Sequence, residues 1–130
     1  MTPQPLRRSR QHPYPPEVKA ATILDVTRGP GKKHGNPFAV VKYSSQFMIT
    51  FYGKPYWTCG DMGEAQATKK AVDLFREYLR RMFDKNPVKF ATLIAPVKAA
   101  DFLACWCALP PDGEPDVCCH RSVWREACEW

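Results

Sequence analysis

The chain has 130 residues, of which 45% are hydrophobic, so one domain with a hydrophobic core is expected. A formal net charge of +6 favours an anionic partner, although a solvated basic surface would have the same composition. No apolar run is long enough to cross a bilayer and the first residues lack a signal-peptide core, which argues against a membrane partner and predicts a cytoplasmic location. In that reducing compartment, six cysteines are expected to be metal ligands, reactive thiols or buried residues rather than three disulfides.

Residues 1–19 contain five prolines among polar residues, a composition that does not bury enough apolar area to fold. We expect a flexible basic tail here, followed by a single domain over residues 20–130. The first element of that domain is predicted at residues 21–26, a short β-branched run typical of a buried strand.

The next stretch, residues 27–38, reads TRGPGKKHGNPF and combines three glycines with the cations Arg28, Lys32 and Lys33. Glycine lets a backbone approach a ligand closely, and the cations suit phosphate. The glycine spacing matches neither the phosphate loop nor the dinucleotide fingerprint, and an ordinary glycine-rich turn is the alternative. Asn36 precedes a proline and should be extended, which would leave its carboxamide free to orient a substrate.

Aromatic and β-branched runs at residues 38–43 and 46–52 flank Ser44-Ser45 and predict a β-hairpin. Tyr56 and Trp57 are expected in the loop that follows. There they would stack on a nucleic-acid base or, in the interpretation we favour, cover the core.

A long amphipathic helix is predicted after the capping-box spacing of residues 61–64, with Asp61 as its N-cap. Proline cannot continue a helix, so it should end at Asn86-Pro87. A short second helix is predicted at residues 88–94, ending before Pro96.

A second core strand is predicted at residues 102–107 and a final helix at about residues 119–128. This order of elements predicts an α/β fold in a single domain: a small sheet of βαβ-like units with an inserted β-hairpin and a long amphipathic helix. Ligands of such sheets bind beyond the carboxyl ends of the strands, where the basic loop and the cysteine-rich stretch would both emerge.

Five of the six cysteines lie in the last thirty residues, close to His120. Cys105 and Cys107 would face the same side of a strand, and Cys119 opens the final helix, so three thiolates and an imidazole could form a tetrahedral site for zinc or another soft metal. Alternatively, Cys119 is a reactive thiol activated by the helix dipole and His120 is a general base. The third interpretation is that the cysteines, Cys59 and Cys128 among them, are buried small hydrophobic residues.

A joint pattern is formed by Gly35-Asn36-Pro37-Phe38, the helix around Tyr78-Leu79, the run LACWC at residues 103–107, and Cys119-His120. On these residues, over roughly residues 23–130, the chain resembles a family of bacterial and phage proteins known as domain of unknown function 4326. It departs from that family by a longer loop between CWC and CH, by Arg121 in place of a glycine, and by a hairpin insertion at residues 39–52. The resemblance implies one compact α/β domain, suits a phage source, and groups these residues as the site: Arg28, Asn36, Cys105, Cys107, Cys119 and His120.

The first functional hypothesis is a small phage or bacterial protein that acts on a nucleotide or nucleic acid. In it, Arg28, Lys32 and Lys33 bind phosphate, Asn36 orients the substrate, and Cys119 or His120 carries the chemistry. The second is a non-catalytic nucleic-acid-binding module stabilised by zinc at Cys105, Cys107, Cys119 and His120. The third is a phage protein that sequesters a nucleotide-like signal or binds a host factor.

Overall fold

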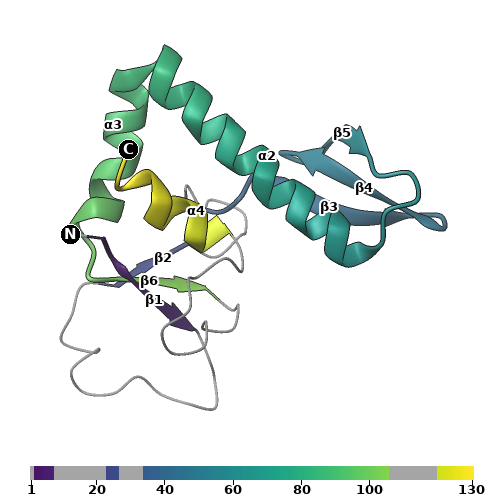
Figure 1. Ribbon diagram of the computed structural model, residues 1–130, viewed down its shortest axis with the longest axis horizontal. Helices are drawn as coiled ribbons and strands as arrows, with labels where there is room; N and C mark the ends of the chain where they lie inside the picture. Colours follow the sequence, from purple (N-terminus) through teal and green to yellow (C-terminus); the bar gives the residue numbers. More distant parts are fainter. Residues whose placement is uncertain (1, 8–22, 27–33, 106–119) are drawn as a thin grey trace.

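The computed structural model describes residues 2–7, 23–26, 34–105 and 120–130, and the side chains of Asp25 and Cys105 lie outside the description. Two small sheets are joined by one long helix (Figure 1). The elements are β1 (Gln4–Arg7), β2 (Ile23–Asp25), β3 (Phe38–Tyr43), β4 (Gln46–Phe51), β5 (Lys54–Thr58), α2 (Glu64–Lys85), α3 (Pro87–Ala99), β6 (Phe102–Cys105) and α4 (His120–Ala127). The predicted α/β class is confirmed, and no helix in these ranges is long and apolar enough to cross a membrane.

The first sheet is parallel and has the order β1-β6-β2. Phe102 of β6 is in register with Gln4 on one side and with Ile23 on the other. The prediction of a flexible tail is therefore wrong for residues 4–7, which pair with a strand near the other end of the chain. Pro5 is tolerated there because β1 is an edge strand. An edge strand has a hydrogen-bonded neighbour on one side only, so fewer of its N–H groups are needed for pairing. Residues 8–22 of the predicted tail lie outside the described residues.

The second sheet is an antiparallel meander of β3, β4 and β5. The predicted hairpin is confirmed, with Phe38 opposite Phe51 and a turn at Ser44 whose φ is +57°. The chain then forms a third strand, so Tyr56 and Trp57 lie in β5 rather than in a loop. The two residues are 54% and 41% exposed, and the Tyr56 ring lies against the buried ring of Phe38 with centroids 5.3 Å apart, so Tyr56 covers part of the core as the favoured interpretation expects.

The two long helices follow the predicted apolar pattern but differ at their ends. Gly63 rather than Asp61 is the N-cap of α2, and its N–H donates to Oε1 of Gln66 at 3.4 Å. The second helix, α3, continues through Pro96 instead of ending before it. Proline removes the hydrogen bond to the carbonyl four residues earlier, which belongs to Thr92 on the exposed face, where water can replace the lost donor.

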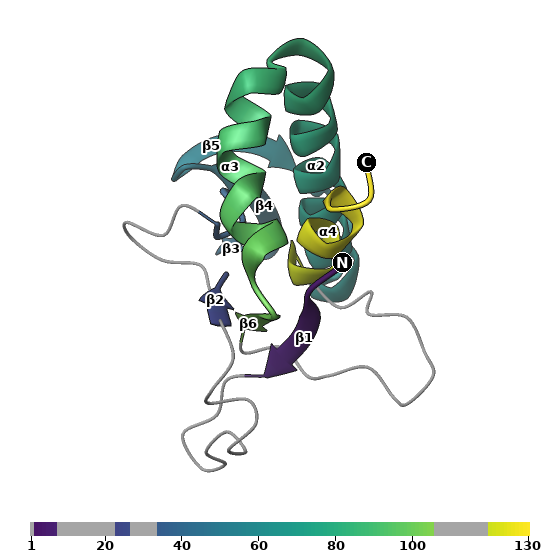
Figure 2. The ribbon, with the colours of Figure 1, turned by 90° about the vertical axis from the view of Figure 1, so that its left-hand side faces the viewer.

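One continuous hydrophobic core joins the two sheets along α2. It includes Ile49 of the meander, Phe75 and Leu79 of α2, and Leu103 of β6. α3 runs back beside α2, and α4 packs on α2 next to α3 (Figure 2). α2 therefore fixes the position of α4, and with it the residues at the start of α4, relative to both sheets.

The junction between α2 and α3 allows a first test of the fold. Oδ1 of Asn86 accepts a hydrogen bond from the Lys89 N–H at 3.3 Å and so caps α3. Asn86→Ala is expected to lower the free energy of unfolding by about 1 kcal/mol, because the first turn of α3 loses this acceptor. Urea denaturation would measure the change. Asn86→Asp keeps an acceptor and should be close to wild type, so an equal loss in both variants would contradict the capping role.

Candidate functional site

The three parallel strands end at one edge of their sheet, at Arg7, Asp25 and Cys105. The segments that follow these strands, residues 8–22, 27–33 and 106–119, lie outside the described residues. They contain five predicted site residues, and the structure therefore tests none of these: Arg28, Lys32, Lys33, Cys107 and Cys119. Cys105 is placed by its backbone alone, as the last residue of β6, so the described side chains of the predicted site are those of Asn36 and His120.

His120 is the first residue of α4 and is buried at the carboxyl edge of the parallel sheet. Its Nε2 makes a hydrogen bond with the carbonyl of Val26, the residue that follows β2. A carbonyl only accepts, so Nε2 carries the proton in this contact. A metal ion or a substrate proton could then interact with this imidazole only through Nδ1. The arrangement is the one found in metal-ligating histidines, whose second ring nitrogen donates to a carbonyl or carboxylate.

Arg121, which was not predicted as a site residue, lies beside His120 at the same edge. Its side chain is fully buried, and Nη1 donates to the carbonyl of Leu6 in β1 at 3.1 Å. The positive end of the α4 dipole also lies at this edge. The sequence does contain a signal for the burial of Arg121, because Arg121 is three residues before Trp124 and so falls on the buried stripe of the final helix.

Asn36 does not have the free carboxamide that its position before Pro37 suggested. The residue is 3% exposed, and its Oδ1 accepts the N–H of Phe38 at 2.8 Å. Its Nδ2 donates to the carbonyl of Ala71 in α2 at 3.5 Å. The carboxamide therefore fixes the turn before β3 and ties it to α2, so the expectation of a free carboxamide is wrong.

Trp124 connects the end of the basic loop to α4. Its Nε1 donates to the carbonyl of His34 at 2.7 Å, and the two rings meet edge to face with centroids 5.2 Å apart. Phe75 of α2 packs against the other side of the indole at 5.4 Å. Packing therefore brings His34, near the end of the predicted basic loop, onto α4, while residues 27–33 and 106–119, which were predicted to converge, lie outside the described residues.

The two cysteines with described side chains lie away from this edge. Cys59 is buried, as predicted, and Cys128 is half-buried, so only part of the second prediction holds. Burial raises the pKa of the Cys128 thiol, and nearby Lys98 partly opposes the shift. Within the described ranges, no three histidine, cysteine or acidic side chains cluster as a metal site would require. A metal site at the carboxyl edge would need the cysteines outside those ranges.

Comparison with protein families gives one match, to the model described as domain of unknown function (DUF4326), over residues 7–130. The chain belongs to this family. Searches of curated proteins and of solved structures found no significant match. The resemblance based on GNPF, CWC and CH is confirmed, and the match begins at the last residue of β1. The carboxyl edge of the parallel sheet, with the start of α4, thus lies within the DUF4326 domain.

Proposed function

We propose that this DUF4326 protein acts on a phosphate-bearing ligand, a nucleotide or nucleic acid, at the carboxyl edge of its parallel sheet. The main observation in support of the proposal is that the first turn of α4 contacts the ends of the parallel strands. His120 contacts the carbonyl after β2, and Arg121 contacts a carbonyl of β1. Open parallel sheets bind their ligands at this place.

The charge distribution supports an anionic ligand. Residues 26–60 contain five basic side chains and no acidic one. Arg28 is two residues beyond Val26, so covalent geometry keeps its Cα within about 7 Å of that strand end. Lys32 and Lys33 follow in the same stretch of the sequence.

Chemistry at this edge would come from His120 and its neighbour Cys119. In the tautomer that donates Nε2–H to the Val26 carbonyl, Nδ1 is the basic nitrogen of the imidazole, and this is the nitrogen that would serve as a general base. Cys119 directly precedes His120 in the sequence, and a thiol at the start of a helix would be favoured as a thiolate by the helix dipole. Asn36 serves this site indirectly, because its carboxamide ties the turn before β3 to α2.

A zinc-stabilised binding module is the second candidate, and one specific observation favours it. The hydrogen bond from His120 to a backbone carbonyl is the second-shell contact typical of zinc ligands. Cys105 ends β6 at the same edge, and Cys107 and Cys119 are close to it and to His120 in sequence. Together they form a donor set of three sulfurs and one nitrogen, which suits tetrahedral zinc.

Nucleotide binding tests the first proposal. Titration of the full chain with each of the four ribonucleoside triphosphates should reveal a ligand whose affinity falls at least about tenfold in Arg28→Ala, since a hydrogen bond to a charged group contributes about 1.5–3 kcal/mol. Lys42→Ala, an exposed cation of the meander, is the matched control and should bind as wild type does. Equal affinity in Arg28→Ala and the control, for every ligand that binds, would contradict the assignment of phosphate to this loop.

Metal content and thiol reactivity separate the two candidates. The zinc module predicts about one zinc per chain, with three thiols that become reactive only after chelation. The catalytic thiol predicts no metal and one fast-reacting thiol that disappears in Cys119→Ser. Cys59 and Cys128 should react slowly in either case, the first because it is buried and the second because its pKa is raised. A metal-free chain in which every thiol reacts slowly would contradict both candidates.

A further inference from the structure

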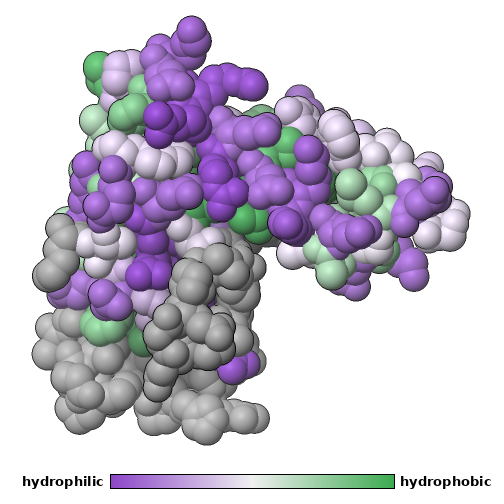
Figure 3. Space-filling view, viewed as in Figure 1, coloured by the Kyte–Doolittle hydropathy of each residue, from purple (hydrophilic) through white to green (hydrophobic). Residues whose placement is uncertain are grey.

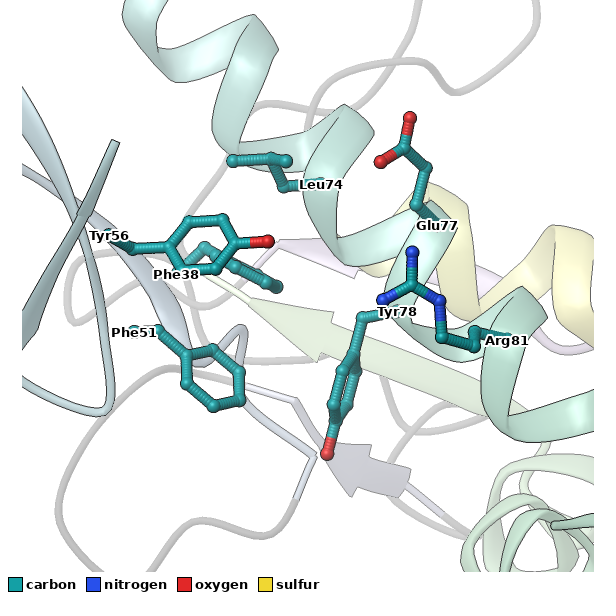
Figure 4. Close-up of a pocket in the computed structure, with 7 residues that line it drawn as sticks. All are labelled: Phe38, Phe51, Tyr56, Leu74, Glu77, Tyr78 and Arg81. Carbon is teal, nitrogen blue, oxygen red and sulfur yellow. The ribbon is translucent and has the colours of Figure 1, made fainter. Parts of the chain in front are cut away.

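A second candidate binding surface lies beside the middle of α2, where the meander meets this helix. A pocket of about 210 Å³ opens there between the two elements. Its meander wall consists of Phe38, Phe51 and Tyr56, and its α2 wall consists of Leu74, Glu77, Tyr78 and Arg81. Figure 4 shows Tyr56 and Phe51 extending toward α2, with the Arg81 guanidinium and the Glu77 carboxylate on the opposite side.

The aromatic rings of this pocket are ordered by contacts with one another. Phe38 is buried as the floor, and the Phe51 and Tyr56 rings lie against it with centroids 4.9 and 5.3 Å away. Tyr78 meets Phe51 edge to face at 5.6 Å. Tyr56 nevertheless remains about half exposed, so one ring of a rigid aromatic cluster is open to a ligand.

Exposed aromatic rings flank the pocket, and we refer to the pocket together with these flanking residues as the groove. On one side, the Lys70 ammonium lies 4.4 Å from the ring centroid of Trp57. On the other, Tyr52 packs on Phe51, and its hydroxyl pKa is raised by burial and by Tyr78, whereas Lys89 lowers it. From Lys70 to Arg81, α2 rises by about 16 Å. The groove is therefore long enough for a short stretch of an extended polymer rather than for one small molecule.

More basic than acidic side chains border this groove. Lys54 is opposite Phe51 on the meander, and Lys70, Arg81 and Lys89 come from the helices. The acids are Glu77 in the pocket, and Asp61 and Asp73, which line a neighbouring hollow with Lys70. Neither Arg81 nor Glu77 forms an ion pair in the part of the chain that the structure describes. In Figure 3 the meander surface carries green and near-white residues among purple ones, whereas the visible face of α2 is mainly purple.

We propose that the groove between the meander and α2 binds single-stranded nucleic acid, with one base in the pocket stacked on Tyr56. Exposed aromatic rings interleaved with cations suit a chain in which flat bases alternate with phosphates. The carboxylate of Glu77 would accept hydrogen bonds from a base amino group, and Arg81 would bind phosphate. This surface is separate from the carboxyl-edge site, so the inference goes beyond the proposed function.

Binding of a short fluorescein-labelled oligodeoxycytidylate, whose bases carry an amino group, followed by anisotropy, tests the inference on the full chain. Tyr56→Ala is expected to weaken binding by about 5- to 150-fold, the range for loss of one base-stacking ring. Tyr56→Phe keeps the ring and should retain most of the affinity. Arg81→Gln should weaken binding and reduce the slope of log affinity against log salt by about one.

Tyr43→Ala is the matched control, because Tyr43 is 71% exposed in β3 but alternates to the face opposite Phe38 and the pocket. An equal loss in Tyr43→Ala, or no oligonucleotide binding at low salt, would overturn the inference. So would equally tight binding of duplex DNA, which hides its bases, or equal competition by oligoglutamate, which has charge without rings. Tyr56→Ala should leave nucleoside triphosphate binding unchanged, so the two proposals can fail independently.

Discussion

Replacing Trp124 by alanine is expected to lower the free energy of unfolding by about 3–5 kcal/mol, the usual cost of removing a buried tryptophan. The indole is 1% exposed, packs between His34 and Phe75, and gives its N–H to the His34 carbonyl. The total free energy of unfolding of a small domain is about 5–15 kcal/mol, so the variant should unfold at a much lower urea concentration. Urea denaturation followed by circular dichroism would measure the shift.

Two further variants separate the contributions to this effect. Trp124→Phe keeps an aromatic ring but leaves the His34 carbonyl without its donor, which should cost about 1–3 kcal/mol. Trp57→Ala removes an exposed tryptophan and should change stability by no more than about 0.5 kcal/mol. A loss below about 1 kcal/mol in Trp124→Ala would show that α4 does not depend on this packing.

Arg121→Ala is expected to cost about 3 kcal/mol or more. The substitution removes a fully buried side chain, which leaves a cavity, and it takes the donor away from the Leu6 carbonyl. Because Arg121 joins α4 to β1, the N-terminal strand should also lose protection. Hydrogen exchange of the β1 amides, measured together with urea denaturation, would detect both effects.

Arg121→Met tests how much the guanidinium contributes to stability apart from the aliphatic part of the side chain. Methionine fills much of the same volume without a donor, so this variant should lose only about 1–3 kcal/mol. The exposed Arg81→Ala is the matched control, and its stability should stay within about 0.5 kcal/mol of wild type. If Arg121→Met matched that control, the hydrogen bond to β1 would contribute nothing measurable.

The parts of the fold that could be predicted are those specified by local pattern. The apolar stripe of α2 repeats every three or four residues, and Ala71, Phe75, Leu79 and Met82 are indeed buried. The hairpin of β3 and β4 could be predicted in the same way, because two β-branched runs flank a two-residue turn. In both cases the residues that contact one another are close in sequence, so the spacing of apolar residues is enough to predict the element.

Long-range contacts were not predictable in this way. Nothing in the proline-rich composition around Pro5 indicates a strand, because β1 exists only through its pairing with β6. The role of Asn36 was missed for the same reason: the acceptor of its Nδ2 is Ala71, thirty-five residues further along the chain. The sequence located the candidate site by residue type but could not show which polar groups the fold itself uses.

The pairing of β1 with β6 also has a consequence for how the protein is made. Gln4 leaves the ribosome about one hundred residues before its partner Phe102 has been synthesised. At about 5–20 residues per second, the first strand waits roughly 5–20 s with its backbone unpaired. Pro3, just before the strand, and Pro5 within it lack N–H donors, which limits pairing with other nascent chains during that interval. The parallel sheet, and any site at its edge, can therefore be completed only late in synthesis, after β6 and α4 have emerged.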